Sequence, residues 1–252
     1  MLKTPVLSPS QIDDFNRDGF VVLRGAFDND EVTDIERSLI ELTDLPEELG
    51  KHWVYWENSL KDPAQKIISR IENISPFVSG FKTLSDTLKK PVAQLLREPA
   101  VLFKEKINFK YPGADGFKPH QDQQAGWWEY ADFFISVMVC IDEATAENGC
   151  LQMVAGHHKS GLIREWEPLT EEDTADMDFV FAPTRPGDVV FFDCYAPHGS
   201  EPNMSDSTRR LYFATYNRAS DGDFLEKYYA DKRKSYPPDI ERQAGREYTY
   251  RV

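Results

Sequence analysis

The second half of the chain is a series of short apolar blocks, and this pattern limits the possible folds more than any other feature. After residue 100 the blocks are VLFKEKINFKY, DFFISVMVCID, CLQMVA, DVVFFDC and RRLYFATYNRA. Turn sequences such as Pro112-Gly113 and Asn148-Gly149 separate them. Many short strands following one another in this way predict a β-sandwich or a β-barrel.

Helical patterns come before these strands. Ser8 followed by Pro9 predicts the N-cap and the first turn of a short helix. The segment GFVVLRGAF predicts a strand, and Asp28 is the predicted cap of a second helix whose apolar residues share one face. A third helix is expected over about residues 79–96, whereas the segment 53–73 is interpreted as a loop. The chain is thus predicted to be α+β.

The bulk composition predicts one domain, because no Gly/Ser run, Pro-rich spacer or repeat interrupts the 252 residues. We expect a helical part (about 1–100), a β-rich part (about 101–220) and a C-terminal extension (about 221–252) that ends in a loose tail, REYTYRV. The net charge of -14 argues against nucleic-acid and anionic-membrane partners. The sequence does not indicate the oligomeric state.

The expected compartment is the cytoplasm. No signal peptide and no apolar run long enough to cross a membrane is visible in the sequence. The odd number of cysteines and their apolar surroundings predict buried free thiols, which suit a reducing compartment. They are Cys140, Cys150 and Cys194.

Two potential metal ligands stand two residues apart in FKPHQDQQAGWWEY. On an extended segment His120 and Asp122 would point to the same face, so an imidazole and a carboxylate could share one metal ion. The pair alone is a weak signal. His198 offers a third ligand, because it follows the Pro-Gly turn and apolar strand of PGDVVFFDCYAPHGS. Two histidines and one carboxylate form the facial triad of non-haem Fe(II) oxygenases, although zinc hydrolysis stays open on ligand count.

Arg209 favours the iron enzyme over the zinc enzyme. It begins the strand RRLYFATY, which we expect to lie beside the strand that ends at His198. A fixed guanidinium can bind the distal carboxylate of 2-oxoglutarate through two parallel hydrogen bonds, and a zinc hydrolase has no such requirement. Arg210 points to the opposite face and is interpreted as a surface residue.

The block FKEKINFKY carries a basic face that leads into the metal segment. Its members are Lys104, Lys106, Asn108 and Lys110. Lys104 is interpreted as decoration of an exposed strand edge. Asn108 and Lys110 lie nearest to His120 in the sequence, so we expect them to point inward and hold anionic groups.

These motifs together resemble the phytanoyl-CoA dioxygenase-like family of Fe(II)/2-oxoglutarate oxygenases. The resemblance is carried by HQD, ENGCLQMVAGHHKSG and RPGDVVFFDCYAPHGSEPNMSDSTRRLYFATY, over about residues 101–220, and by the opening LSPSQIDDFNRDGFVVLRGAF. It implies a double-stranded β-helix core, also called a jelly roll or cupin-like fold, flanked by helices. The loop MVAGHHKSG departs from the family's more common Pro-Gly-Ser-His pattern, which leaves the role of that loop open.

The resemblance also implies a set of site residues. Fe(II) would be bound by His120, Asp122 and His198, and 2-oxoglutarate by Arg209, Ser200 and Asn108, with dioxygen as the oxidant. Related halogenases lack the carboxylate, so Asp122 favours hydroxylation of a C–H bond. Desaturation and ring formation stay open as other outcomes.

Aromatic and basic residues indicate a small zwitterionic substrate. Aromatic rings can surround an ammonium group through cation–π attraction, and basic side chains can bind a phosphonate or a carboxylate. The predicted substrate-binding residues are Lys110, Trp127 and Tyr195, and Lys118 and Arg218 are further anion-binding candidates.

Within the family, the segment from INFKYPG to HQD resembles enzymes that hydroxylate aminoalkylphosphonates at the carbon next to phosphorus. Examples are 2-aminoethylphosphonate and its N-trimethyl analogue. Hydroxylases of ectoine-like compounds, amino acids or secondary metabolites are the alternatives within the family. A non-catalytic metal-binding jelly roll and a zinc hydrolase are the alternatives of another class.

Overall fold

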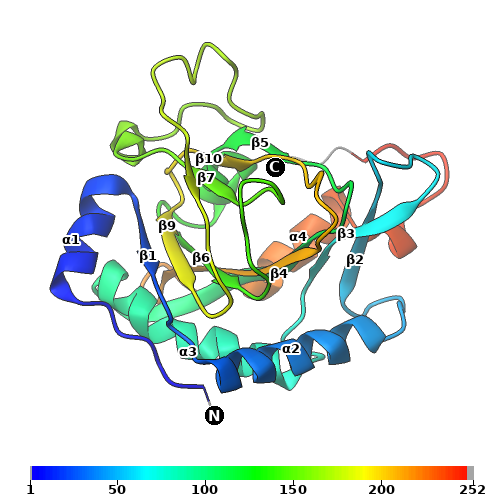
Figure 1. Cartoon of the computed structure of the whole chain (residues 1–252), viewed down its shortest axis with the longest axis horizontal. Coiled ribbons are helices and arrows are strands. Elements are labelled where there is room, and N and C mark those ends of the chain that lie inside the picture. Colours follow the sequence, from blue (N-terminus) through cyan, green and yellow to red (C-terminus); the bar gives the residue numbers. More distant parts are fainter. Residues whose placement is uncertain (1, 249–252) are drawn as a thin grey trace.

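Two antiparallel sheets face each other in the computed structural model, which describes residues 2–248 (Figure 1). In this part of the chain the large sheet has the strand order β1-β9-β6-β11-β4-β3-β2, and the small sheet has the order β5-β10-β7-β8. The strands are β1 (Phe20–Leu23), β2 (Trp53–Asn58), β3 (Lys66–Glu72), β4 (Ala100–Lys110), β5 (Phe117–His120), β6 (Ile135–Cys140), β7 (Leu151–Met153), β8 (Val180–Ala182), β9 (Val189–Asp193), β10 (His198–Ser200) and β11 (Arg209–Arg218).

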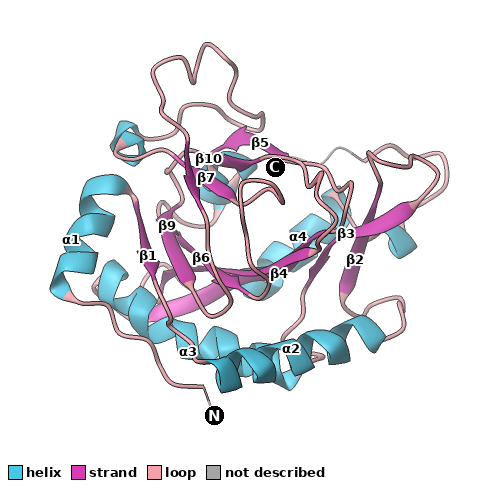
Figure 2. Cartoon of the chain, viewed as in Figure 1, coloured by secondary structure: helices cyan, strands magenta, loops and turns pink. Residues whose placement is uncertain are grey.

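Helices cover the outer side of the large sheet, which confirms the α+β prediction. Figure 2 shows α2 and α3 side by side along this face. The helices are α1 (Pro9–Asp18), α2 (Asn29–Asp44), α3 (Ser79–Leu96) and α4 (Leu225–Ser235), with 3-10 turns η1 (Asp122–Ala125), η2 (Trp127–Glu129), η3 (His157–Ser160) and η4 (Asp239–Glu241). The predicted caps Ser8 and Asp28 each form a capping box, because the third residue of each helix returns a hydrogen bond to the cap.

Apolar side chains fill both faces of the large sheet. Those on its outer face, such as Ile107 and Tyr212, pack with α2 and α3 in one buried cluster. Those on its inner face, such as Val190 and Leu211, pack against Met153 of the small sheet in a second cluster. The two sheets are therefore held together by a core of their own, and the polar residues between them occupy one end of that space.

The segment 53–73, interpreted as a loop, is a β-hairpin, so this interpretation was wrong. Strands β2 and β3 pair with each other, and β3 pairs with β4 through Arg70↔Asn108 and Glu72↔Lys106. The first half of β2 is buried on both faces, and the inner face of β3 carries buried Arg70 and Glu72. Neither strand shows a simple alternation of apolar and polar residues, which is why the sequence pattern hid them.

Placing β3 beside β4 also makes β4 an internal strand. Lys104 is buried, at 7% exposure, with its ammonium near the Trp127 and Tyr228 rings, and the prediction that it decorates an exposed edge was wrong. The three cysteines are buried free thiols, as predicted. Among residues 2–248, no helix combines the length and apolarity that crossing a membrane requires. The last four residues of the predicted tail, 249–252, lie outside the described residues.

Candidate metal centre

The three predicted metal ligands converge between the sheets. Strands β5 and β10 pair antiparallel with His120 opposite His198, and the centroids of the two imidazole rings are 4.2 Å apart. Asp122 is the first residue of η1, directly after β5, and its Oδ1 lies 4.0 Å from the Nε2 atom of each histidine. One ligand atom from each residue falls within 4.8 Å of the others. This spacing suits three ligands of a single ion.

Hydrogen bonds orient each ligand toward the common centre. The Nδ1 atoms of His120 and His198 lie 2.7 and 3.0 Å from the backbone carbonyls of Lys118 and Ala196. Because a carbonyl oxygen only accepts, Nδ1 carries the proton and Nε2 keeps its lone pair for a metal. The Ser136 hydroxyl donates to Oδ2 of Asp122, which leaves Oδ1 facing the histidines.

The charge states of the triad also fit a divalent metal. Burial, and secondarily the nearby His198, lowers the pKa of His120 to about 3, and burial lowers the pKa of His198 as well. Burial works to raise the pKa of Asp122, but the neighbouring His198 and Lys104, and then His120 and Lys106, bring it below its ordinary value. Two neutral imidazoles and one carboxylate are therefore presented at neutral pH, as a metal ion requires.

A small cavity of about 40 Å³ lies against the triad. Its far wall is formed by the inward faces of β4 and β11, with Lys104, Lys106 and Asn108 from β4 and Arg209, Phe213 and Thr215 from β11. Ser200 of β10 lies on the near wall together with the triad. The cavity thus combines apolar side chains, such as Phe213, with the three cationic side chains Lys104, Lys106 and Arg209.

Arg209 reaches this cavity from a direction that the sequence did not predict. Its strand β11 lies between β4 and β6 in the large sheet, whereas His198 is on β10 of the small sheet, so the expectation of adjacent strands was wrong. The chain crosses from one sheet to the other between Asp193 and His198, since β9 pairs with β1 and β6 while β10 pairs with β5 and β7. Arg209 therefore faces the triad across the cavity.

The arginine is buried without a partner. It is 2% exposed, and within residues 2–248 its side chain makes no hydrogen bond or ion pair; its Nε is fully enclosed. Burial lowers its pKa to about 10. Oδ1 of Asn108, on the same wall, is also buried without a hydrogen bond. A buried guanidinium is costly unless it meets an anion, so the residues present fit a carboxylate ligand in this cavity.

Comparison with known proteins identifies this arrangement. The family model "Phytanoyl-CoA dioxygenase (PhyH)" matches residues 15–211. The chain belongs to the phytanoyl-CoA dioxygenase family. It is accordingly an iron- and 2-oxoglutarate-dependent dioxygenase, with the jelly-roll core that the resemblance implied, and the zinc-hydrolase and non-catalytic alternatives fall away.

The similarity to individual relatives extends over most of the chain. It is 39% identical to the 2-aminoethylphosphonate dioxygenase of uncultured bacterium HF130_AEPn_1, over 92% of this chain and 89% of the relative. It is 36% identical to the methylphosphonate hydroxylase of Gimesia maris, over 91% and 88%. The crystal structure of EctD from S. alaskensis with 2-oxoglutarate and 5-hydroxyectoine matches with a TM-score of 0.72 at 26% identity, over 85% of this chain and 77% of that chain.

Lys110 is not among the residues that line the metal cavity. It is 1% exposed, and its Nζ donates to Ser200 Oγ at 2.8 Å and to the carbonyl of Glu201. Lys104 is also directed inward, with its ammonium 4.4 Å from the centre of the Trp127 ring. Lys104, Lys106 and Asn108 of β4 thus line the metal cavity, and Lys110 lies at the end of this row without lining it.

The other two predicted substrate residues lie outside the metal cavity. Trp127 is 2% exposed and packs edge-on against Phe103 and Phe134. The Tyr195 hydroxyl donates to the carbonyl of Asp132 at 2.9 Å. Neither residue lines the metal cavity, and their assignment to substrate stays a prediction.

A second cavity, of about 260 Å³, adjoins the metal cavity and shares Phe117 and His120 with it. Its other lining residues include Glu57, Arg70 and Trp166, which the sequence reasoning did not single out. Trp166 lies in a loop without a periodic sequence pattern, so the sequence gives no signal for it. Its backbone conformation is what distinguishes it. Its φ is +66°, which is unusual for a bulky residue.

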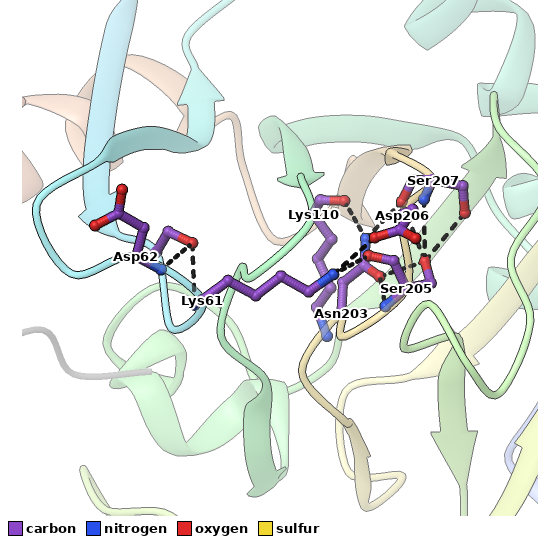
Figure 3. A network of polar contacts seen from close by, with 8 residues as sticks. Lys61, Asp62, Lys110, Asn203, Ser205, Asp206 and Ser207 are labelled. Carbon is purple, nitrogen blue, oxygen red and sulfur yellow. Dashed lines mark hydrogen bonds and ion pairs between the residues drawn. The ribbon is translucent and has the colours of Figure 1, made fainter.

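A polar network holds the loop that leads into Arg209 (Figure 3). Asn203 donates to the carbonyls of Lys110 and Ser207, both at 2.7 Å. Lys61, from the β2–β3 hairpin, donates to the Ser205 carbonyl and pairs with Asp206, both at 2.9 Å. The loop is thus anchored to β4 on one side and to the hairpin on the other, which fixes where β11 and its first arginine begin.

Proposed function

We propose that this dioxygenase hydroxylates a small phosphonate, an aminoalkylphosphonate by preference, at the carbon next to phosphorus. In this proposal Fe(II) is held by His120, Asp122 and His198, and 2-oxoglutarate by Arg209, Ser200 and Asn108. The iron supplies the oxidising chemistry, with 2-oxoglutarate and dioxygen as co-substrates. The choice of phosphonates is supported by two relatives whose names state phosphonate substrates.

The protein's own contribution is to position the metal ligands and the co-substrate. Ser136 holds the Asp122 carboxylate and is itself 3.1 Å from the Thr215 hydroxyl, so the ligand is fixed from the large sheet. The backbone carbonyls behind both histidines keep their Nε2 atoms aimed at one point. Arg209 binds the distal carboxylate of the co-substrate, and the apolar side chains of Phe192 and Phe213 exclude water from the reacting atoms.

The observation that carries the substrate class is Lys106. It lies on the cavity wall, with its ammonium 5.5 Å from the Phe117 ring centre and 5.6 Å from that of Phe213. Among the described residues it makes no hydrogen bond and no ion pair, and burial lowers its pKa. A phosphonate brings up to two negative charges and three acceptor oxygens, which suits an ammonium between two rings beside the metal.

The second cavity supports the amino group in the proposed substrate class. Acidic Glu57 and Asp115 line it together with basic Arg70 and Lys118, so it presents both signs of charge. Burial raises the pKa of Glu57, while the nearby Asp115 backbone, Ser69 and Lys110 act in the opposite direction. A zwitterion finds complementary groups there, whereas methylphosphonate would leave the acidic side without a partner.

The test is succinate release with 2-aminoethylphosphonate, methylphosphonate, ectoine and glycine as substrates. We expect turnover of the two phosphonates, with the higher kcat/KM for 2-aminoethylphosphonate. Lys106→Met should raise the phosphonate KM at least about tenfold, because it removes a charged partner of a buried anion, and leave 2-oxoglutarate affinity in place. Lys66→Met, on the exposed side of β3, is the control. Turnover of ectoine with no turnover of either phosphonate would refute the proposal.

A further inference from the structure

Two buried cations face each other at one end of the metal cavity. Lys110 and Arg209 are directly opposite in the β4–β11 pairing, and they are 1% and 2% exposed. Directly paired residues of an antiparallel sheet point to the same face, so both side chains project toward the small sheet. There they meet β10, whose Ser200 Oγ is 2.8 Å from Lys110 Nζ. Ser200 lines the metal cavity, as does Arg209.

The surroundings of Lys110 are built to hold its ammonium in this place. The ammonium also donates to the Glu201 carbonyl, and the Lys110 carbonyl accepts from Asn203 at 2.7 Å (Figure 3). Gly149 makes the space for this contact. A Cβ at that position would lie 2.2 Å from the Glu201 carbonyl oxygen and 2.9 Å from Lys110 Nζ. The Asn148-Gly149 turn thus leaves room for the Lys110 ammonium and its contact with the Glu201 carbonyl.

The direction of the Lys110–Ser200 hydrogen bond has a chemical consequence. In its ammonium form Lys110 has three donors and no acceptor, so Ser200 Oγ accepts from it. The hydroxyl hydrogen of Ser200 is then left for another acceptor, and the cavity lies on that side. We propose that Lys110 is a positioning residue for the distal carboxylate of 2-oxoglutarate, since it makes Ser200 a donor and adds a second positive charge beside Arg209. This inference rests on the proposed assignment of Arg209 and Ser200 to 2-oxoglutarate.

Electrostatics support the same role. Burial, and then the like charge of Arg209, lowers the pKa of Lys110 to about 7, while Glu57, Asp115 and Glu201 act in the opposite direction. Two like charges are thus held close together in a buried place. An anion between them relieves their repulsion, so the pair favours a bound carboxylate more than a single arginine does. Lys110, predicted from sequence to bind substrate, is here assigned to the co-substrate.

The experiment measures 2-oxoglutarate affinity without turnover, from the visible charge-transfer band that forms with Fe(II) in the absence of oxygen. Lys110→Met and Ser200→Ala should each weaken binding about 10- to 100-fold, as expected for a lost hydrogen bond to a charged group. The double variant should be weaker than either single one, but by less than the two effects added together, because the lysine acts partly through the serine and partly through its own charge. Lys110→Gln keeps a donor but not the charge, so it should fall between wild type and Lys110→Met.

Two comparisons separate this role from a structural one. 2-Oxopentanoate has the chain length of 2-oxoglutarate without the distal carboxylate, so Lys110→Met should leave its affinity unchanged. Lys66→Met should change neither affinity. The inference is overturned if Lys110→Met binds 2-oxoglutarate like wild type, or if the effects of Lys110→Met and Ser200→Ala on affinity add. It is also overturned if Lys110→Met loses affinity for both oxo acids equally. If Arg209→Met also leaves 2-oxoglutarate affinity unchanged, the proposed co-substrate site is wrong and the inference fails with it.

Discussion

Replacing Arg209 by methionine should stabilise the ligand-free protein and weaken co-substrate binding. The buried guanidinium has a pKa of about 10 in place of 12.5, a difference of about 2.5 units, and each unit corresponds to about 1.4 kcal/mol. Keeping Arg209 charged thus lowers the free energy of unfolding by up to about 3 kcal/mol below pH 10, and this loss of stability disappears as pH rises from about 10 to 12.5. Methionine has a similar volume and no charge, so it removes this cost.

The same substitution removes the partner of a buried carboxylate, which typically costs about 2 to 5 kcal/mol of binding, or roughly 30- to 4,000-fold in affinity. Thermal unfolding at neutral pH, with and without saturating 2-oxoglutarate, shows both effects in one assay. The variant should melt higher than wild type by several degrees without the ligand, and the order should reverse with it.

Arg210→Met is the matched control for this prediction. Arg210 lies next in the chain on the opposite face of β11, where it pairs with Asp142 at 2.6 Å. Its loss should lower stability slightly and leave 2-oxoglutarate affinity unchanged. A ligand-free Arg209→Met protein that melts lower than wild type would show that the guanidinium has stabilising partners, contrary to the reasoning. Unchanged co-substrate affinity would remove Arg209 from the site.

Three further substitutions test the supporting structure. Burial raises the pKa of Asp193 from 3.8 to about 7, so wild type should lose stability relative to Asp193→Asn between these two pH values and no further above them; parallel curves would contradict this. Glu72→Gln leaves Arg70 and Lys232 without the carboxylate that they contact at 2.7 and 2.6 Å. Chemical denaturation should then show a free energy of unfolding that is lower by about 3 to 5 kcal/mol. A change near zero would mean that water replaces the carboxylate. Gly126→Ala would place a Cβ 2.0 Å from the Trp166 ring, at a φ of +81°, so tryptophan fluorescence should report a displaced loop and melting should be lower; unchanged spectra would count against this contact.

The sequence by itself indicated three of the four α-helices within residues 2–248, the candidate metal ligands and the arginine proposed to bind the co-substrate, whereas α4 was not predicted. Ser8 and Asp28 cap helices through contacts three residues away, so the information is local. His120 and Asp122 are close in the chain, and the requirement for a third ligand after an apolar strand selected His198. These features depend on residue type and short spacing, both of which a sequence displays directly.

Only the tertiary structure decided which side chains of the β-rich half meet. The hydrogen bond from Lys110 to Ser200 joins residues 90 positions apart, and no sequence pattern in either segment predicts it. The sequence predicts Lys104 on an exposed strand edge, because the hairpin that pairs with the same strand has no alternating pattern. Burial and strand order result from the packing of distant segments, whereas periodicity reports only the immediate neighbours of a residue. The residue types of the metal centre were therefore readable from the sequence, whereas the cavity in which Lys104, Lys106 and Arg209 come together was not.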